Sequence, residues 1–104
     1  MRVAGIMSGT SLDGFDVAIV DVHGGRKTRV ETVAFRMHAY PANVRAAILS
    51  VSDTMTHTSA ISRLNFLLGE LYADALLKTC RSAKIAPASI ELCGMHGQTI
   101  FHEG

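Results

Sequence analysis

Small polar residues lie between two glycines in the stretch of this sequence most able to do chemistry. The stretch MSGTSLDGFD places Gly9 and Gly14 at the ends of its polar part. A tight turn with a glycine at each end can direct several backbone N–H groups at one point, and such a concave arrangement binds phosphate oxygens. Thr10 and Ser11 add hydroxyl donors, and Asp13 is compatible with phosphate when Mg²⁺ stands between the two. The loop therefore predicts a site for phosphate and a divalent metal ion.

Two other interpretations of this loop have to be compared with that prediction. The glycine spacing is that of a Walker A loop, but Phe15 and Asp16 stand where the Lys and the Ser or Thr belong. A strand is also expected to follow in place of a helix, so the loop is not of the Walker type. The remaining alternative is a β-hairpin turn whose glycines supply positive φ and whose polar side chains face water. The loop alone leaves the hairpin and the phosphate site both open.

A second candidate motif, CGMHGQTIFHEG, begins at Cys93. A strand ending at Met95 would deliver His96 and Gln98 to the carboxyl edge of the sheet, where open α/β folds bind their ligands. An imidazole and an amide suit sugar hydroxyls or an N-acetyl group. The alternative is that His96 satisfies a backbone carbonyl and shapes a turn. A zinc site formed with Cys93 and His102 lacks any established ligand spacing.

The hydrophobic pattern predicts an α/β fold with the element order β-β-β-α-α-β. Strands are expected at residues 3–8, 15–22 and 28–38, joined by tight turns so that the first three run antiparallel. The second of these strands is apolar on both faces, which predicts a central strand that is buried on both sides. The third carries several charges and is expected at an edge of the sheet.

Two helices and a last strand complete the expected order. Pro41 fits the first turn of a short helix, whose buried face comprises Val44, Ala47, Ile48 and Val51. A longer helix is capped by Thr58 or Ser59 and ends near Ser82, and its buried stripe comprises Ile61, Leu64, Leu68, Leu71, Ala75 and Leu76. A strand is expected at residues 90–95 and a brief extended segment at 100–102. The methionines are expected in the core or at its margins, namely Met7, Met37, Met55 and Met95.

Length, charge and cysteine content limit the class of protein. A chain of 104 residues with 48% hydrophobic residues is expected to form one unit without an internal boundary. A formal net charge of +1 gives no basic excess for nucleic acid or for an anionic membrane surface, and no apolar run is long enough to span a bilayer. Cys80 and Cys93 form no CxxC or zinc motif, so reduced thiols and a cytoplasmic location are expected.

Two motifs in combination resemble one known family. MSGTSLDGFDVAIVDV after a first strand, and CGMHGQTIFHEG further on, resemble the N-terminal portion of anhydro-N-acetylmuramic acid kinases, which are sugar kinases of the actin-like ATPase (ribonuclease H-like) superfold. YPANVRAAIL and LNFLLGELYADAL also stand where that family places helices. The resemblance covers the whole chain, and the expected element order matches the opening of the family's first lobe. It implies that residues 1–104 are the N-terminal part of the first lobe of a two-lobed kinase, because the family's chains are several times longer.

The resemblance also implies a reaction and a set of roles. The first phosphate loop for ATP would comprise Gly9, Thr10, Ser11, Leu12, Asp13, Gly14, Phe15 and Asp16, with Asp13 holding Mg²⁺ through water. His96 and Gln98 would contact the sugar. The family phosphorylates 1,6-anhydro-N-acetylmuramic acid at O6 with hydrolytic opening of the anhydro ring, giving N-acetylmuramic acid 6-phosphate for peptidoglycan recycling. Its general base belongs to a DFR-type segment expected beyond Gly104, so no catalytic residue is expected within this segment.

Two functional classes follow from these observations. In the first, the chain is part of an ATP-dependent sugar kinase and is inactive by itself. In the second, it is a free-standing small domain that binds a phosphorylated ligand or a partner without catalysis. The expected partner is a small amino sugar, with no nucleic acid and no membrane, and a homodimer remains open.

Overall fold

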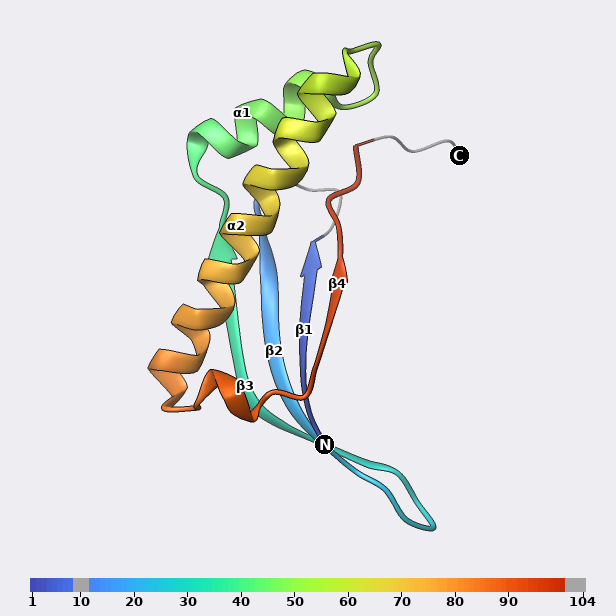
Figure 1. Ribbon diagram of the computed structural model, residues 1–104, viewed down its shortest axis with the longest axis vertical. Helices are drawn as coiled ribbons and strands as arrows, with labels where there is room; N and C mark the ends of the chain where they lie inside the picture. The colour runs from blue at the N-terminus through green and yellow to red at the C-terminus, as the bar shows by residue number, and fades with distance from the viewer. Residues whose placement is uncertain (9–11, 101–104) are drawn as a thin grey trace.

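A four-stranded mixed β-sheet forms the frame of the molecule in the computed structural model, which describes residues 1–8 and 12–100 (Figure 1). Along the chain, the elements are β1 (Arg2–Ser8), β2 (Gly14–His23), β3 (Arg29–Ala39), α1 (Ala42–Val51), α2 (Thr58–Ala83), the short 3-10 helix η1 (Pro87–Ser89) and β4 (Leu92–His96). The expected order of strands and helices is present, and η1 is an addition. η1 begins at Pro87 and has Ile90 as its C-cap, and the last strand begins at Leu92, two residues later than expected. The expected segment at 100–102 lies mostly outside the described residues.

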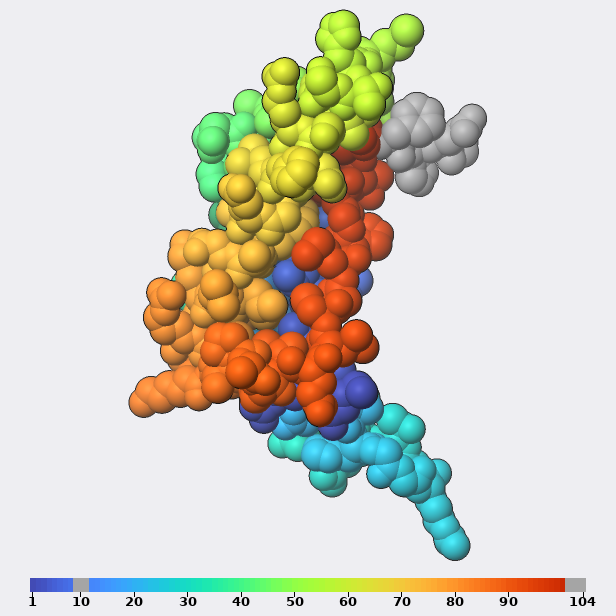
Figure 2. All heavy atoms as spheres, in the orientation of Figure 1, coloured from blue at the N-terminus to red at the C-terminus, as the bar shows by residue number. Residues whose placement is uncertain are grey.

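The strands lie side by side in the order β3-β2-β1-β4. β1 pairs with β2 and β2 with β3 in the antiparallel sense, as expected for the first three strands, and β4 pairs with β1 in the parallel sense. A register shift at Ile19/Val20 marks a bulge in the β2–β3 pair. β3 is an edge strand, as predicted, and the tip of the β2–β3 hairpin projects beyond the rest of the molecule (Figures 1 and 2).

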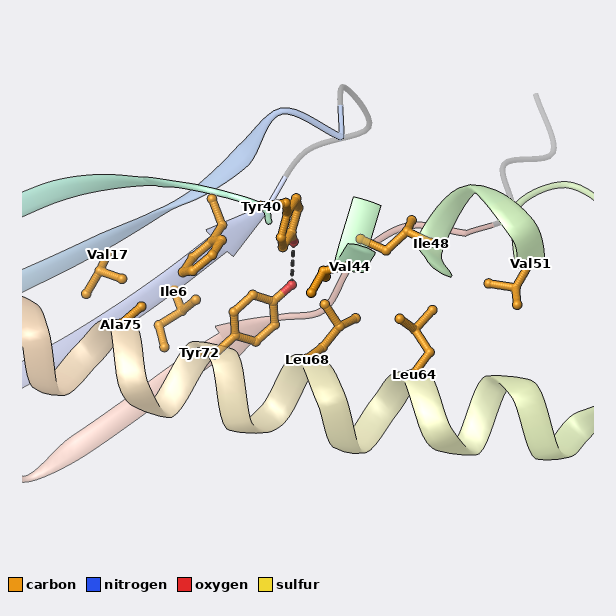
Figure 3. Packing of buried hydrophobic residues seen from close by; sticks show 11 residues of the cluster. Ile6, Val17, Tyr40, Val44, Ile48, Val51, Leu64, Leu68, Tyr72 and Ala75 are labelled. Carbon is orange, nitrogen blue, oxygen red and sulfur yellow. Dashed lines mark hydrogen bonds between the residues drawn. The ribbon is translucent and has the colours of Figure 1, made fainter. Parts of the chain in front are cut away.

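Helix α2 covers one face of the sheet, and α1 packs against its first half (Figure 3). The strands turn alternate residues toward α2, so that Ile6, Phe15 and Val17 are almost fully buried. On α2 the buried residues are Leu64, Leu68, Tyr72, Ala75, Thr79 and Cys80. Two neighbouring clusters form the core, and the larger one joins α1, α2 and the ends of the strands near Tyr40.

The opposite face of the sheet is open among the described residues. Alternate β2 residues on this face, from Asp16 to Val22, are only half-buried, so the prediction that β2 is buried on both sides is wrong for this part of the chain. The reason is that α2 lies against the other face. The open face is mainly apolar and carries Met7, Phe35 and Met37, which are 64%, 58% and 75% exposed. The expectation that the methionines lie in the core or at its margins is therefore wrong for Met7, Met37 and Met55, whereas Met95 lines a cavity beside α2.

Helix α2 differs from its prediction in its first turn and in its buried stripe. Thr58 is already helical and His57 is the N-cap without a side-chain hydrogen bond, so neither Thr58 nor Ser59 caps the helix. Tyr72 takes the central buried position, whereas Ile61 is 40% exposed and Leu71 is half-buried. Leu64, Leu68 and Ala75 are buried as predicted, so the stripe differs from the prediction at Ile61 and where Tyr72 replaces Leu71. None of the helices in the part of the chain that the structure describes is long and apolar enough to cross a membrane.

Candidate functional site

The loop between β1 and β2 is held at its two ends by the sheet. Ser8 is the last residue of β1 and Gly14 the first of β2. Gly9, Thr10 and Ser11 lie outside the described residues. Leu12 has a φ of 63°, in the left-handed region, and the carbonyl oxygen of Asp13 accepts a hydrogen bond of 3.2 Å from the backbone N–H of Tyr40. The loop is thus anchored to the end of β3 just before β2 begins.

Gly14 is required by a close backbone approach. A Cβ at this position would overlap the carbonyl oxygen of His38 in the neighbouring strand. Gly14 does not have a positive φ, so the hairpin alternative, in which the glycines supply positive φ, does not explain this residue. Among the described loop residues, it is Leu12 that takes the left-handed conformation.

A transverse row of side chains crosses the open face beside this loop. In the register of the sheet, Met37 pairs with Asp16, Asp16 with Met7, and Met7 with His96. Directly paired residues share a face, so these four side chains lie on the face that α2 leaves uncovered. Asp16 and His96 flank the strand of Met7, which places their Cα atoms about 10 Å apart. A ligand on this face can therefore meet a carboxylate from β2 and an imidazole from β4.

A hollow of about 610 Å³ lies over the β2 and β3 part of this row. Its lining residues are Met7, Asp13, Gly14, Phe15, Asp16, Met37, His38 and Ala39. The structure describes five residues of the predicted phosphate loop, and all of them except Leu12 line this hollow. Asp13 is exposed and Asp16 is half-buried, so both carboxylates can be reached from solvent.

The two predicted sugar residues lie on opposite sides of the sheet. His96 is exposed and belongs to the row on the open face. Gln98 follows the end of β4 and turns toward α2, where its Oε1 accepts a hydrogen bond of 2.9 Å from the Tyr40 hydroxyl. It also lines a mainly apolar cavity of about 190 Å³ beside α2. The structure therefore places both residues at the predicted edge but does not bring their side chains together.

Ser8 connects the base of the loop to the end of β4. Its hydroxyl lies 3.4 Å from the carbonyl oxygen of His96 and 3.2 Å from that of Gly97, and it can donate to either. Ser8 is 8% exposed, so water competes little for this contact. The segment that carries His96 is thus fixed against Ser8, the residue that precedes the predicted phosphate loop.

Two buried tyrosines support the same segment from beneath. The hydroxyl oxygens of Tyr40 and Tyr72 lie 2.6 Å apart (Figure 3). Tyr40 also contacts Gln98. Burial, followed by the hydrogen bond with Tyr72, raises the pKa of Tyr40 well above its usual value. Tyr40 therefore remains a neutral hydrogen-bond donor throughout the physiological pH range.

The donor set is compatible with a hydrated Mg²⁺ ion. Carboxylate oxygens are ligands that Mg²⁺ favours, and this ion commonly keeps several waters and takes one or two carboxylates from the protein. Asp13 and Asp16 line one hollow and fit that pattern. Within residues 1–8 and 12–100, no cluster of three or more His, Cys, Asp or Glu side chains is placed to hold a metal without such help. These residues therefore suit a metal that arrives with another anionic ligand.

The sequence interpretation missed Ser8, Tyr40 and Tyr72. Tyr72 could have been found from spacing, because it follows Leu68 by four residues and precedes Ala75 by three. Tyr40 carried no such signal, since its role depends on contacts with Asp13 and Gln98, which are remote in sequence. Ser8 was recognised only as the end of a strand.

These features define an α/β domain with a candidate site at the edge of a mixed sheet. The model of the family described as anhydro-N-acetylmuramic acid kinase matches residues 1–104, and the chain belongs to this family.

Individual relatives agree with the family match. The chain is 47% identical over 102 residues to an anhydro-N-acetylmuramic acid kinase of Caldanaerobacter subterraneus subsp. tengcongensis. The matched region covers 96% of this chain and 26% of the relative. It is 38% identical over 105 residues to proteins of the same name from Bacillus cereus (strain AH820) and Bacillus thuringiensis (strain Al Hakam), covering 99% of this chain and 28% and 27% of these relatives. The chain thus spans about a quarter of the length of the curated relatives that it matches.

Proposed function

We propose that this chain is the N-terminal part of the first, actin-like lobe of an ATP-dependent kinase that phosphorylates 1,6-anhydro-N-acetylmuramic acid at O6 and opens its anhydro ring. The observation that carries the proposal is the family match over the whole chain together with the meeting of two motifs at one sheet edge. The relatives' names support the substrate class, and the product would be N-acetylmuramic acid 6-phosphate. The remainder of the two lobes, including the general base, would come from residues beyond this segment.

The phosphate side of the proposed site is the loop from Gly9 to Asp16. Its backbone N–H groups would bind phosphate oxygens of ATP, because a short loop between two strands can direct several donors at one anion. Asp13 and Asp16 would repel those oxygens in the absence of a cation, so Asp13 is proposed to hold Mg²⁺ through water. Bound Mg²⁺ would neutralise charge that develops on the transferred phosphoryl group.

The sugar side of the proposed site is the end of β4. His96 lies on the open face in one row with Asp16, so an acceptor sugar held there would be close to the phosphate loop. An imidazole can donate to or accept from sugar hydroxyls. Gln98 contributes at the same strand end, from the side that faces α2. An amino sugar across this edge would be oriented by both residues.

Assay of the full-length protein tests the proposal. With Mg²⁺, ATP and 1,6-anhydro-N-acetylmuramic acid, mass spectrometry should find a product that has gained both a phosphoryl group and a molecule of water. The same mixture without Mg²⁺ is the control and should give no product. A phosphorylated sugar that keeps its anhydro ring would contradict the proposed reaction. ATP consumption at a rate that does not depend on the sugar would contradict it as well.

His96→Ala and Gln98→Ala test the sugar side separately. Either change should raise the KM for the sugar and leave the KM for ATP nearly unchanged, because neither residue belongs to the phosphate loop. Cys93→Ala is a suitable control, since Cys93 is exposed on the same strand and has no proposed contact with either substrate. A rise in the KM for ATP alone would place His96 and Gln98 at the nucleotide instead.

A further inference from the structure

Tyr40 contacts both halves of the candidate site. Its backbone N–H donates to the carbonyl oxygen of Asp13 at 3.2 Å, and its hydroxyl donates to Oε1 of Gln98 at 2.9 Å. Its ring packs against Phe15, with ring centroids 5.3 Å apart. With 7% of its surface exposed, Tyr40 is a core residue that reaches the phosphate loop through its main chain and the end of β4 through its side chain.

The hydrogen bonds around Tyr40 have a defined direction. A tyrosine hydroxyl has one proton, and Tyr40 gives that proton to Gln98. Tyr72, which is 1% exposed, must then donate to the Tyr40 oxygen across their distance of 2.6 Å. The amide group of Gln98 is oriented from its other end as well, because Nε2 donates to the carbonyl oxygen of Thr99 at 3.1 Å. The chain of hydrogen bonds from Tyr72 through Tyr40 to Gln98 therefore fixes one orientation of the Gln98 amide.

We infer that Tyr40 is a positioning residue for the sugar side of the site: its hydroxyl, backed by Tyr72, holds the Gln98 amide and with it the turn that follows His96. The inference rests on the proposed function and deepens it, because it names Tyr40 as the core residue that positions the proposed sugar side at the end of β4. Ser8 fixes the same turn from the other strand through the carbonyl groups of His96 and Gly97. Tyr40 does not touch the substrates and acts through Gln98.

Tyr40→Phe in the full-length protein removes the hydroxyl and keeps the ring and the backbone. The contact with Asp13 is made by the backbone N–H of residue 40, so it survives the substitution. The KM for the sugar should therefore rise by roughly two- to tenfold, the range expected for loss of one hydrogen bond. The KM for ATP should stay the same.

Tyr72→Phe is the matched control, because it removes one buried hydroxyl from the same cluster and leaves the bond from Tyr40 to Gln98. It should lower thermal stability about as much as Tyr40→Phe and raise the sugar KM less, because the bond from Tyr40 to Gln98 remains. Equal rises in sugar KM for the two variants would show that the tyrosine pair acts only through stability, and this result would overturn the inference. An unchanged sugar KM in Tyr40→Phe would overturn it as well.

Gln98→Met provides a second variant, since it keeps the length of the side chain and removes the acceptor for Tyr40. It should raise the sugar KM, and Tyr40→Phe should add nothing further in the double variant because both changes break the same bond. Additive effects would contradict the inference while leaving Gln98 on the sugar side. If neither His96→Ala nor Gln98→Met changes the sugar KM, the proposed sugar side itself fails, and the role of Tyr40 fails with it.

Discussion

His38 and Thr79 join the edge strand β3 to helix α2 by a side-chain hydrogen bond of 3.0 Å between Nε2 and Oγ1. Thr79 uses its own proton to donate to the carbonyl oxygen of Ala75 at 2.8 Å, so His38 must be the donor at Nε2. The imidazole also stacks on Phe15, with ring centroids 5.4 Å apart and an angle of 15° between the planes. A partly buried histidine is thereby built into the packing next to the predicted phosphate loop.

The stability of the protein should fall as the pH drops below about 6.5, the ordinary pKa of histidine. Burial, and then the positive charges of Arg36 and Lys78, lower the pKa of His38 in the folded protein. The unfolded chain therefore binds more protons in the interval between the two pKa values, so the contribution of His38 is complete above the unfolded value and is lost as the pH falls toward the folded value. The melting temperature of His38→Asn should depend less on pH between 7 and 5 than that of the parent, and equal slopes would contradict the assignment.

Asp13→Asn should lower kcat in the full-length protein on the order of 10²-fold, because a carboxylate that positions Mg²⁺ acts chiefly when charge moves on the phosphoryl group. Folding should change little, since Asp13 is exposed and its structural contact is made by its backbone carbonyl. Asp74→Asn is the control: Asp74 is an exposed carboxylate on α2 that pairs with Lys78 at 3.0 Å. Equal activity of Asp13→Asn and the parent across a magnesium titration would rule out this role.

Gly14→Ala should destabilise the protein by about 1–3 kcal/mol, because the added methyl group would overlap the His38 carbonyl and push β2 away from β3. Gly69→Ala is a control of opposite sign. Gly69 lies inside α2 with no atom within 4 Å of a new Cβ, so alanine should stabilise the helix by about 0.5–1 kcal/mol. Chemical denaturation of both variants measures the difference, and a Gly14→Ala protein as stable as the parent would contradict the close approach.

Ile48→Ala should cost about 2–5 kcal/mol, because Ile48 is fully buried between α1 and α2 and its removal leaves a cavity. The next residue, Leu49, is 53% exposed, and Leu49→Ala should change the stability by no more than about 0.5 kcal/mol. Thermal unfolding distinguishes the two neighbours. Similar losses would mean that α1 presents a different face to α2.

Residues 1–104 alone should bind ATP too weakly for calorimetric titration to detect. Two or three charge-assisted hydrogen bonds from the loop contribute roughly 1.5–3 kcal/mol each, against an association cost of about 4–15 kcal/mol. The adenine and ribose would also lack the pocket that the remainder of a kinase supplies. Saturable binding at micromolar affinity would show that the segment is a self-sufficient nucleotide-binding module.

The sequence predicted those parts of the fold that depend on local patterns. Alternating apolar residues located β1, β2 and β3, and the 3.6-residue period located α1 and α2 to within one or two residues at most ends. The edge position of β3 followed from its charges. The one-sided burial of β2 could not be predicted from the sequence. Apolar residues on both faces of a strand indicate burial, but they do not identify which segment covers each face. Tyr72 was missed because leucines at neighbouring positions suggested a slightly rotated stripe.

The candidate site was predicted in its residues more than in its geometry. Gly14, Asp13 and Asp16 were identified from loop composition, and the structure places all three around one hollow. The separation of His96 from Gln98 was not foreseen, because β4 ends at His96 and its alternation does not continue to Gln98. Long-range contacts such as that between Tyr40 and Gln98 depend on the sheet order and leave no trace in local spacing.

The position of β1 between β2 and β4 sets an order of events during synthesis on the ribosome. The pairing of β1 with β2 joins neighbouring segments, whereas the pairing of Met7 with His96 must wait until α2, η1 and β4 have all been translated. Until then only β1, β2 and β3 are available to pair, and β1 would be the unprotected edge next to β2. Contacts of such large sequence separation form late, and exposed strand edges attract other chains in the meantime. Ser8, which precedes the predicted phosphate loop, therefore gains its contacts with the carbonyl groups of His96 and Gly97 only after β4 has been translated.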